Sequence, residues 1–380
     1  MGLKNPQAPA ALMFHLKPHL YMETVIKKSD FILQPYMRSN NLKAAYQVLN
    51  TLIPYFLLWY LAFYTSKISL LFLPPIIILI VLFSLRCFSL MHDCGHNSLF
   101  TSKLANRIVG FVFGAINAMP QYWWARDHAY HHKTNGDWER YRGIGDFLST
   151  QEYEQLSESG QKLYRYTRHP FMTLVGGFFY LAFKPRLILL LGIFDFMRHS
   201  FNCLRRDPKV TFADIKSSHK PKYWGTEAEF WDVFLNNIVV ISSWVFFSNL
   251  MGAGFFLTVY ALVLMLAAAV FIAVFFVQHN FEDAYAHKTE GWDYLLGAVE
   301  GSSYLKLPAV LNWFTADIGY HSIHHLSEKI PNYNLRACHK QNLHLLGKVK
   351  TLGIKDMLHC SGFILWDAAG DRLVSIKEYS

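Results

Sequence analysis

The sequence ISLLFLPPIIILIVLFSLRCFSLMHDCGH, residues 68–96, joins a long apolar run directly to a pair of histidines. The run covers about residues 68–91, and a helix needs about 20 residues to cross the roughly 30 Å hydrocarbon layer of a bilayer. Two prolines lie near its start, where a missing backbone N–H does little harm to a helix. The stretch therefore predicts a membrane span that leads into His92 and His96.

Three other apolar stretches combine with this run into two hairpins. Residues 48–64 precede it across a short link, and residues 230–248 are joined to residues 253–277 by a short uncharged link. The expected fold is all-α, with four transmembrane helices. Shorter apolar stretches, interrupted by glycine, proline or charged residues, are expected to lie in the membrane interface or dip into it: residues 105–119, 171–183 and 187–201.

Composition and charge agree with a membrane protein. Hydrophobic residues make up 52% of the chain and charged residues 17%, against about 25% charged in soluble domains. Six basic residues fall in residues 1–45 and eighteen between His92 and Phe230, whereas the two short links hold only Lys67. The positive-inside rule then places both termini and the central segment in the cytoplasm. Because the basic residues form no nucleic-acid-binding motif, we expect no nucleic acid partner.

Histidines carry the strongest functional signal. Positions i, i+3 and i+4 share a helix face, so a cluster with this spacing can direct two or three imidazoles to one point, and imidazole binds iron, copper, zinc and nickel. By chance this composition would give about 0.04 copies of His-x-x-His-His, yet the chain has two. Eight of the eighteen histidines form three clusters: His92 and His96; His128, His131 and His132; His321, His324 and His325.

The first cluster follows the second span, the second lies in the cytoplasmic segment and the third follows the fourth span, so all three are expected to face the cytoplasm. Eight imidazoles exceed the needs of one metal ion. A pair of metals fits this count. The chain has no His-Glu-x-x-His, so a zinc-peptidase site is excluded, and it lacks the Glu-x-x-His pairs of soluble di-iron bundles. His15 and His19 bracket a proline in the basic leader, and we interpret that pair as incidental. His279, just after the fourth span, is a ninth candidate.

The three clusters, read as HDCGHNSLF from His92, HAYHH from His128 and HSIHH from His321, resemble those of the membrane fatty-acid desaturases. The three residues between His92 and His96 are similar to the acyl-lipid branch of that family. The resemblance covers roughly residues 45–345. Other similar stretches are GIGDFLSTQEY from Gly143, RHPF from Arg168, VQHNFEDAY from Val277, EGSSYLKLP from Glu300, DIGYHSIHHLS from Asp317 and IPNYNL from Ile330.

The resemblance implies a di-iron centre under a cytoplasmic helical cap. It also implies three parts of the chain: a leader at 1–45, a membrane desaturase domain at 46–345 and a C-terminal tail at 346–380. Ser322 stands where related sequences carry another histidine, so position 322 is left out of the ligand set. The implied iron ligands are His92, His96, His128, His131, His132, His279, His321, His324 and His325.

The implied reaction uses O2 to remove two hydrogens from adjacent methylenes of a membrane lipid's acyl chain. An unactivated methylene offers no acidic proton, so the metal cofactor has to supply that chemistry. No flavin or nicotinamide fingerprint is present, so an external ferredoxin-like or cytochrome-like electron donor is expected. The rivals are a lipid or carotenoid hydroxylase with the same oxidant and, in another class, a non-catalytic membrane metal-binding protein.

Carboxylates near the clusters are expected to accept the second N–H of metal-bound imidazoles and so orient the rings. The residues expected around the ligands are Asp93, Asp127, Asp283, Asp317 and, for a metal-bound water, Asn280. A bacterial inner membrane is the preferred location, with the endoplasmic reticulum as the alternative.

Overall fold

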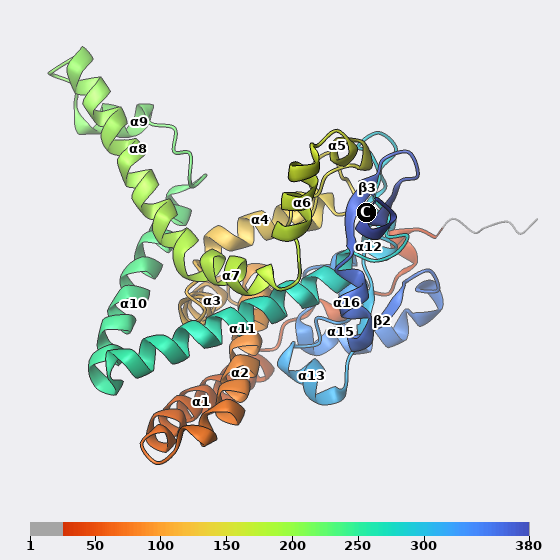
Figure 1. The fold of residues 1–380 in the computed structure, drawn as a ribbon, viewed down its shortest axis with the longest axis horizontal. Coiled ribbons are helices and arrows are strands. Elements are labelled where there is room, and N and C mark those ends of the chain that lie inside the picture. The colour runs from red at the N-terminus through yellow and green to blue at the C-terminus, as the bar shows by residue number, and fades with distance from the viewer. Residues whose placement is uncertain (1–25, 380) are drawn as a thin grey trace, which may run out of the picture.

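The computed structural model describes residues 26–379, and in this range the chain is mostly helical (Figure 1). His15 and His19 lie outside the described residues. The long helices are α1 (Asn41–Ser66), α2 (Leu73–Gly95), α8 (Lys184–Arg206), α10 (Glu227–Met251) and α11 (Ala253–His279). The shorter ones are α3 (Lys103–Ile116), α4 (Gln121–Thr134), α5 (Thr150–Glu154), α6 (Glu158–Thr167), α7 (Met172–Phe178), α9 (Phe212–Ser218), α12 (Tyr294–Val299), α13 (Ala309–Phe314), α14 (His321–Leu326), α15 (Asn332–Gln341) and α16 (Met357–Cys360).

The first hairpin consists of α1 and α2. Asn40 caps α1, where its side chain accepts a hydrogen bond from the backbone N–H of Lys43 at 3.0 Å. The prolines of the quoted stretch lie in the first turn of α2, where no intrahelical donor is lost. Helix α2 then continues through His92 to Gly95, so the span and the first histidine pair form one continuous element.

The second hairpin consists of α10 and α11. Only Gly252 separates the two helices, and its φ of +84° is a conformation that a side chain would strain. At the other end of the hairpin, Thr226 caps α10 by accepting from the backbone N–H of Glu229 at 3.2 Å. The start of α10 packs against α4, where Asp232 accepts from the backbone N–H of Tyr122 at 2.8 Å and Glu229 pairs with Arg126 at 2.6 Å.

Within residues 26–379, five helical runs are long and apolar enough to cross a membrane. Four of them correspond to the four expected spans. The fifth is Met172–Arg206, in which α7, a π-helical segment (η4, Phe179–Phe183) and α8 follow one another without a break. The sequence predicts two separate stretches there, interrupted at residues 184–186.

The run continues through these three residues because each has a compensating contact. Pro185 cannot donate to the carbonyl of Leu181 four residues earlier, but the Arg186 guanidinium donates to that carbonyl at 3.1 Å. The Lys184 ammonium lies over the ring of Tyr180, 4.6 Å from its centroid, and the Arg186 guanidinium donates to the carbonyl of Ala118 at 2.6 Å. Two charges that looked like helix breakers are therefore satisfied by tertiary contacts.

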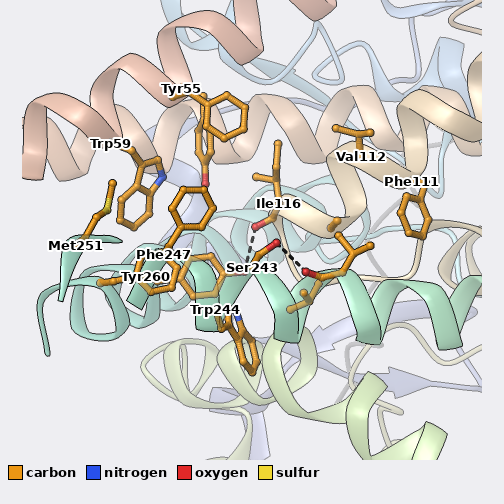
Figure 2. Close-up of a pocket in the computed structure, with 15 residues that line it drawn as sticks. Tyr55, Trp59, Phe111, Val112, Ile116, Ser243, Trp244, Phe247, Met251 and Tyr260 are labelled. Carbon is orange, nitrogen blue, oxygen red and sulfur yellow. Dashed lines mark hydrogen bonds between the residues drawn. The ribbon is translucent and has the colours of Figure 1, made fainter. Parts of the chain in front are cut away.

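A cavity of about 220 Å³ lies between α1, α3, α10 and α11 (Figure 2). Its walls are almost wholly apolar. Two of its polar groups are satisfied by backbone carbonyls: Tyr260 Oη donates to Ile116 at 3.2 Å and Ser243 Oγ to Val239 at 2.7 Å. None of the described residues that line it is a histidine, so this cavity is separate from the histidine clusters.

Two small sheets accompany the helices, so the fold is not wholly α. Strands β1 (Tyr304–Lys306) and β2 (Thr351–Gly353) pair in parallel, and β3 (Phe363–Asp367) and β4 (Arg372–Ser375) pair in antiparallel. The C-terminal hairpin packs on the helical part: Trp366 is buried, and its indole N–H donates to the carbonyl of Ala286 at 2.8 Å. Residues after 345 thus form part of the packed structure.

Small residues allow α7 and α11 to pack closely. A β-carbon placed on Gly177 would lie 2.6 Å from the β-carbon of Ala268, while one placed on the neighbouring Gly176 would meet nothing within 4 Å. We expect Gly177→Ala to lower stability by about 1–3 kcal/mol because the two helices would have to separate. Gly176→Ala is the matched control, since it adds the same group in the same helix.

The measurement is the apparent melting temperature of each variant in detergent. Gly177→Ala should melt several degrees below the parent protein, and Gly176→Ala at or slightly above it, because alanine favours a helix over glycine. Equal melting temperatures for the two variants would show that α7 and α11 do not pack as described.

Candidate metal centre

The histidine clusters come from four helices that are far apart in the sequence. The last turns of α2 and α11 supply His92 and His279, and His96 is the residue that caps α2. Helices α4 and α14 each supply three histidines. These helices bring the nine imidazoles together at the ends of the two hairpins.

The nine histidines form two compact groups. Within each group, one nitrogen of every ring lies within 4.8 Å of one nitrogen of every other ring. The group that we call the five-histidine group contains His92, His96, His128, His132 and His324. The group that we call the four-histidine group contains His131, His279, His321 and His325.

Nitrogen atoms within each group lie at the separations that ligands of one metal ion adopt. In the five-histidine group, His132 Nε2 lies 3.0 Å from His128 Nε2 and 3.0 Å from His324 Nε2. In the four-histidine group, His321 Nε2 lies 2.8 Å from His279 Nε2 and 3.1 Å from His325 Nε2. With metal–nitrogen bonds of about 2.0–2.1 Å, ligands around one ion are about 3 Å apart.

Helix geometry divides each triplet between the groups. In α4, His128 and His132 are four residues apart and point to the five-histidine group, while His131 points to the other. In α14 the division is reversed: His321 and His325 point to the four-histidine group and His324 to the five-histidine group. The two groups adjoin, because the rings of His132 and His325 stack with centroids 4.3 Å apart.

Burial keeps the imidazoles neutral. It lowers the pKa of each triplet histidine well below the usual value, and charge repulsion between neighbouring imidazoles adds to this effect. The neutral imidazole is the form that binds a metal, because one of its nitrogens has a free lone pair. The residues concerned are His128, His131, His132, His321, His324 and His325.

Several buried ring nitrogens have no hydrogen-bond partner among residues 26–379. They include Nε2 of His92 and of His96, and both nitrogens of His131. An unsatisfied buried polar group costs about 1–3 kcal/mol, and this cost disappears when a metal ion accepts the lone pair. With two groups of nitrogen donors at ligand separations, the residues present fit a pair of metal ions.

Three of the histidines are held through their second ring nitrogen. His92 Nδ1 lies 3.3 Å from Asp93 Oδ1, and the other oxygen of Asp93 accepts from the backbone and the side chain of Asn332 at 2.7 and 2.8 Å. His96 Nδ1 lies 3.2 Å from Glu328 Oε2, and this hydrogen bond lowers the pKa of Glu328. His279 Nδ1 lies 3.2 Å from the carbonyl oxygen of Gly301.

The other acidic residues expected near the ligands have no hydrogen bond to a described imidazole. Asp127 pairs with Arg126 at 2.9 Å, and Asp283 pairs with Arg372 at 3.2 Å. Asp317 is half-buried, and burial raises its pKa. Of the four aspartates, only Asp93 lies at hydrogen-bond distance from a clustered histidine.

Glu328 and Gly301 also contact the histidines, and no pattern in the sequence indicated either residue. Glu328 comes three residues after His325, but α14 ends at Leu326, so no helical spacing indicated that it would turn back to His96. The contact of Gly301 is made by its backbone, which no residue pattern can reveal.

Aromatic rings form part of the wall. Trp124 stacks on His128 with centroids 4.6 Å apart and an interplanar angle of 14°. Phe275 lies against His131 and His279, at 5.1 and 4.7 Å between centroids. These rings keep the neighbourhood of the imidazoles apolar.

A small cavity of about 10 Å³ touches the four-histidine group. It is lined by His131, His279, Tyr141 and Asn280, among others, and has room for about one water molecule. The Asn280 amide donates to the carbonyl of Phe363 at 2.9 Å, so the C-terminal hairpin holds it at the edge of this cavity. Asn280 thus lies beside the histidines.

Comparison with known proteins gives the same family as the motifs. The family model described as fatty acid desaturase matches residues 68–352. A protein of Bacillus subtilis (strain 168) named fatty acid desaturase is 32% identical over 333 residues, which is 87% of this chain and 85% of that protein. The matched range includes every clustered histidine.

Two relatives with more specific names match at lower identity. The sn-1 acyl-lipid omega-3 desaturase (ferredoxin) of Nostoc sp. (strain 36) is 25% identical over 252 residues, 64% of this chain and 60% of that protein. The acyl-lipid omega-3 desaturase (cytochrome b5), endoplasmic reticulum, of Arabidopsis thaliana is 25% identical over 268 residues, 69% of this chain and 61% of that protein. In each case the chain spans about three-fifths of the relative.

The contact between Glu328 and His96 is expected to hold the His96 ring in place for a metal ion. A carboxylate that accepts from a ligating imidazole orients the ring, and its loss typically weakens metal binding about 10–100-fold. We expect Glu328→Gln to release one of two metal ions at a lower chelator concentration than the parent protein does. Asp283→Asn is the control, because Asp283 carries the same charge but contacts Arg372.

Metal per chain is measured by elemental analysis after dialysis against graded chelator. If Glu328→Gln and Asp283→Asn gave the same release curve, Glu328 would not support a metal ligand.

Proposed function

The chain belongs to the fatty acid desaturase family and is a fatty-acyl desaturase, and from this we propose that it forms a double bond in the acyl chain of a membrane lipid at a pair of iron ions. The observation that carries the proposal is the division of nine histidines into two adjoining groups. A single metal ion would need only one of the two histidine groups, whereas a centre with two ions uses both.

We propose that the five-histidine group holds one iron and the four-histidine group the other. Asp93 and Glu328 orient the five-histidine group, and the carbonyl of Gly301 orients His279. When bound, the iron pair supplies with O2 the oxidising power that an unactivated methylene requires. The overall balance is that a CH2–CH2 unit, O2, two electrons and two protons give a cis or trans CH=CH unit and two waters.

The chain's own residues provide the surroundings for this reaction. Phe275 lies against one histidine group and Trp124 against the other, so an acyl chain would meet apolar surfaces on both sides. The one-water cavity at His131 leaves little space for bulk solvent. Both features protect a reactive oxidant from water and side reactions.

We propose a lipid-linked substrate on two grounds. The spacing between His92 and His96 is similar to the acyl-lipid branch, and the Nostoc and Arabidopsis relatives are named acyl-lipid desaturases. Those names also mention ferredoxin and cytochrome b5, respectively. Either class of protein fits the external donor that the electron balance requires.

A topology of four spans is supported by how the helices connect. Helices α2 and α11 both end at the histidines, so α10, joined to α11 by a one-residue turn, begins on the histidine side. Helix α4 carries histidines as well, so the chain between α4 and α10 begins and ends on that side.

If Met172–Arg206 crossed the bilayer, the chain would have to cross back before Glu227. The only helix in that interval, α9, has seven residues and a length of about 10 Å, too short to return through a roughly 30 Å layer. We therefore propose four spans in two hairpins, with the histidines and both termini in the cytoplasm and a bacterial inner membrane as the preferred location over the endoplasmic reticulum.

The function is tested by expression with its electron donor in a host that lacks polyunsaturated lipids. The parent protein should produce acyl chains two hydrogens lighter, and His131→Ala should abolish the product because it removes a nitrogen donor from the four-histidine group. His344→Ala is the control, since this exposed histidine lies outside both groups. Products heavier by one oxygen would instead indicate a hydroxylase.

The topology predicts which introduced cysteines react with a membrane-impermeant thiol reagent. In a Cys203→Ser background, whose four other cysteines are buried, Asn249→Cys should react from outside intact cells and Lys340→Cys only after lysis. Labelling of Lys340→Cys in intact cells would contradict a cytoplasmic histidine side.

A further inference from the structure

Helices α8 and α9 project from the rest of the protein as an arm (Figure 1). We define the arm as residues 184–226, from the start of α8 to the residue that caps α10. Nothing in the proposed reaction uses it. Its sequence nevertheless combines a long apolar face with a concentration of basic residues.

One face of α8 is a continuous exposed apolar stripe. Its members recur every three or four residues, the spacing of one helix face, and Phe194 and Phe201 are 66% and 65% exposed. Phe171, Val175, Phe179 and Phe183 extend the exposed apolar surface along α7 and the π-helical segment. The stripe on α8 consists of Leu187, Leu190, Leu191, Phe194, Met197, Phe201 and Leu204.

The opposite face of α8 is covered by α9 and the chain that follows it. Asp195 accepts from His219 at 3.1 Å, the rings of Phe196 and Phe212 pack edge to face, and His199 lies 3.1 Å from the hydroxyl of Ser218. Trp224 packs against Gly192, where a side chain would collide with its ring. Because its polar face is held by its own chain, α8 presents the apolar stripe outward.

The arm is also strongly basic. It contains nine Lys or Arg and three Asp, so it carries an excess of six positive charges, against +9 for the whole chain. Arg198, Lys216 and Lys222 pair with acidic residues. Four others are exposed and have no ion pair within the described part of the chain: Arg205, Arg206, Lys209 and Lys220.

We propose that the arm is an interfacial membrane element that binds anionic phospholipids. The apolar stripe enters the acyl boundary of the leaflet on the histidine side, and the unpaired cations bind phosphate headgroups beside it. An amphipathic element that combines an apolar face with basic residues on its polar side has this affinity. The inference rests on the proposed four-span topology, because a crossing α8 could not lie along one leaflet.

A depth measurement separates failure of the arm from failure of the topology. Nitroxides are placed by Leu190→Cys, Phe194→Cys and Phe201→Cys in a Cys203→Ser background, with the protein in nanodiscs of 70% phosphatidylcholine and 30% phosphatidylglycerol. Collision with O2 should exceed collision with a water-soluble nickel complex at all three sites, at similar depth. That result supports the proposal.

Three other outcomes would overturn it. A depth that changes steadily from Leu190 to Phe201, about 16 Å along the helix, would mean that α8 crosses the bilayer, and the topology would fail too. Water-exposed labels would overturn the arm proposal alone. Strong dipolar coupling between labels of two chains would show that the stripe binds a second copy of this chain.

The basic component is tested by replacing Arg205, Arg206, Lys209 and Lys220 together with glutamine. The phosphatidylglycerol that co-purifies with the protein, measured by mass spectrometry relative to phosphatidylcholine, should fall at least threefold. The matched control replaces four exposed lysines that also lack ion pairs within residues 26–379: Lys162, Lys340, Lys355 and Lys377. Equal phosphatidylglycerol enrichment in the two variants would exclude headgroup binding by the arm.

Discussion

The structure depends on one requirement: nine imidazoles packed close together must all have partners for their ring nitrogens. Hydrogen bonds alone do not meet it, because Nε2 of His92 and of His96 and both nitrogens of His131 have no partner in the described part of the chain. Each unsatisfied nitrogen would cost the fold about 1–3 kcal/mol. A metal ion bound in each group would remove that cost and would couple metal binding to the folding of this region. The two hairpins position the histidines, since α2 and α11 both end at the histidine groups.

The scarcity of carboxylates around the histidines has a physical reason. A buried carboxylate must be paired or solvated, and either solution brings charge or water to the place where an apolar chain has to lie. Imidazoles avoid this problem because burial leaves them neutral, as the lowered pKa of His128 and His325 indicates. The two carboxylates that do contact clustered histidines, Asp93 and Glu328, approach His92 and His96 through Nδ1. Charge is thus kept to one edge of the five-histidine group, and the aromatic side at Phe275 stays apolar.

A structural feature could be predicted from the sequence where it depends on residues that are close together in the chain, and could not where it depends on tertiary contacts. The clustered histidines were identifiable because helical spacing places i and i+4 on one face. Four of the five candidate membrane helices were identifiable because apolar length is read from the chain directly. The acids were not. Asp127 and Asp283 are as near to histidines in sequence as Asp93 is, yet they pair with Arg126 and Arg372, and only the tertiary fold decides between those partners. Glu328 reaches His96 across a helix end, for which no spacing rule exists.

The segment Met172–Arg206 is apolar and long enough to be a span, yet the proposed topology keeps it on one side of the membrane. Hydropathy describes whether a helix can enter a bilayer, and this run meets that criterion as well as α1 does. A crossing, however, also needs its two ends on opposite sides, and here α4 before the run and α10 after it are both tied to the histidine side. Under the proposed topology, the same connection would account for the exposed stripe on α8, because a helix that is apolar enough to enter the bilayer, but whose ends are held on one side, can bury its apolar face only along the surface of the membrane.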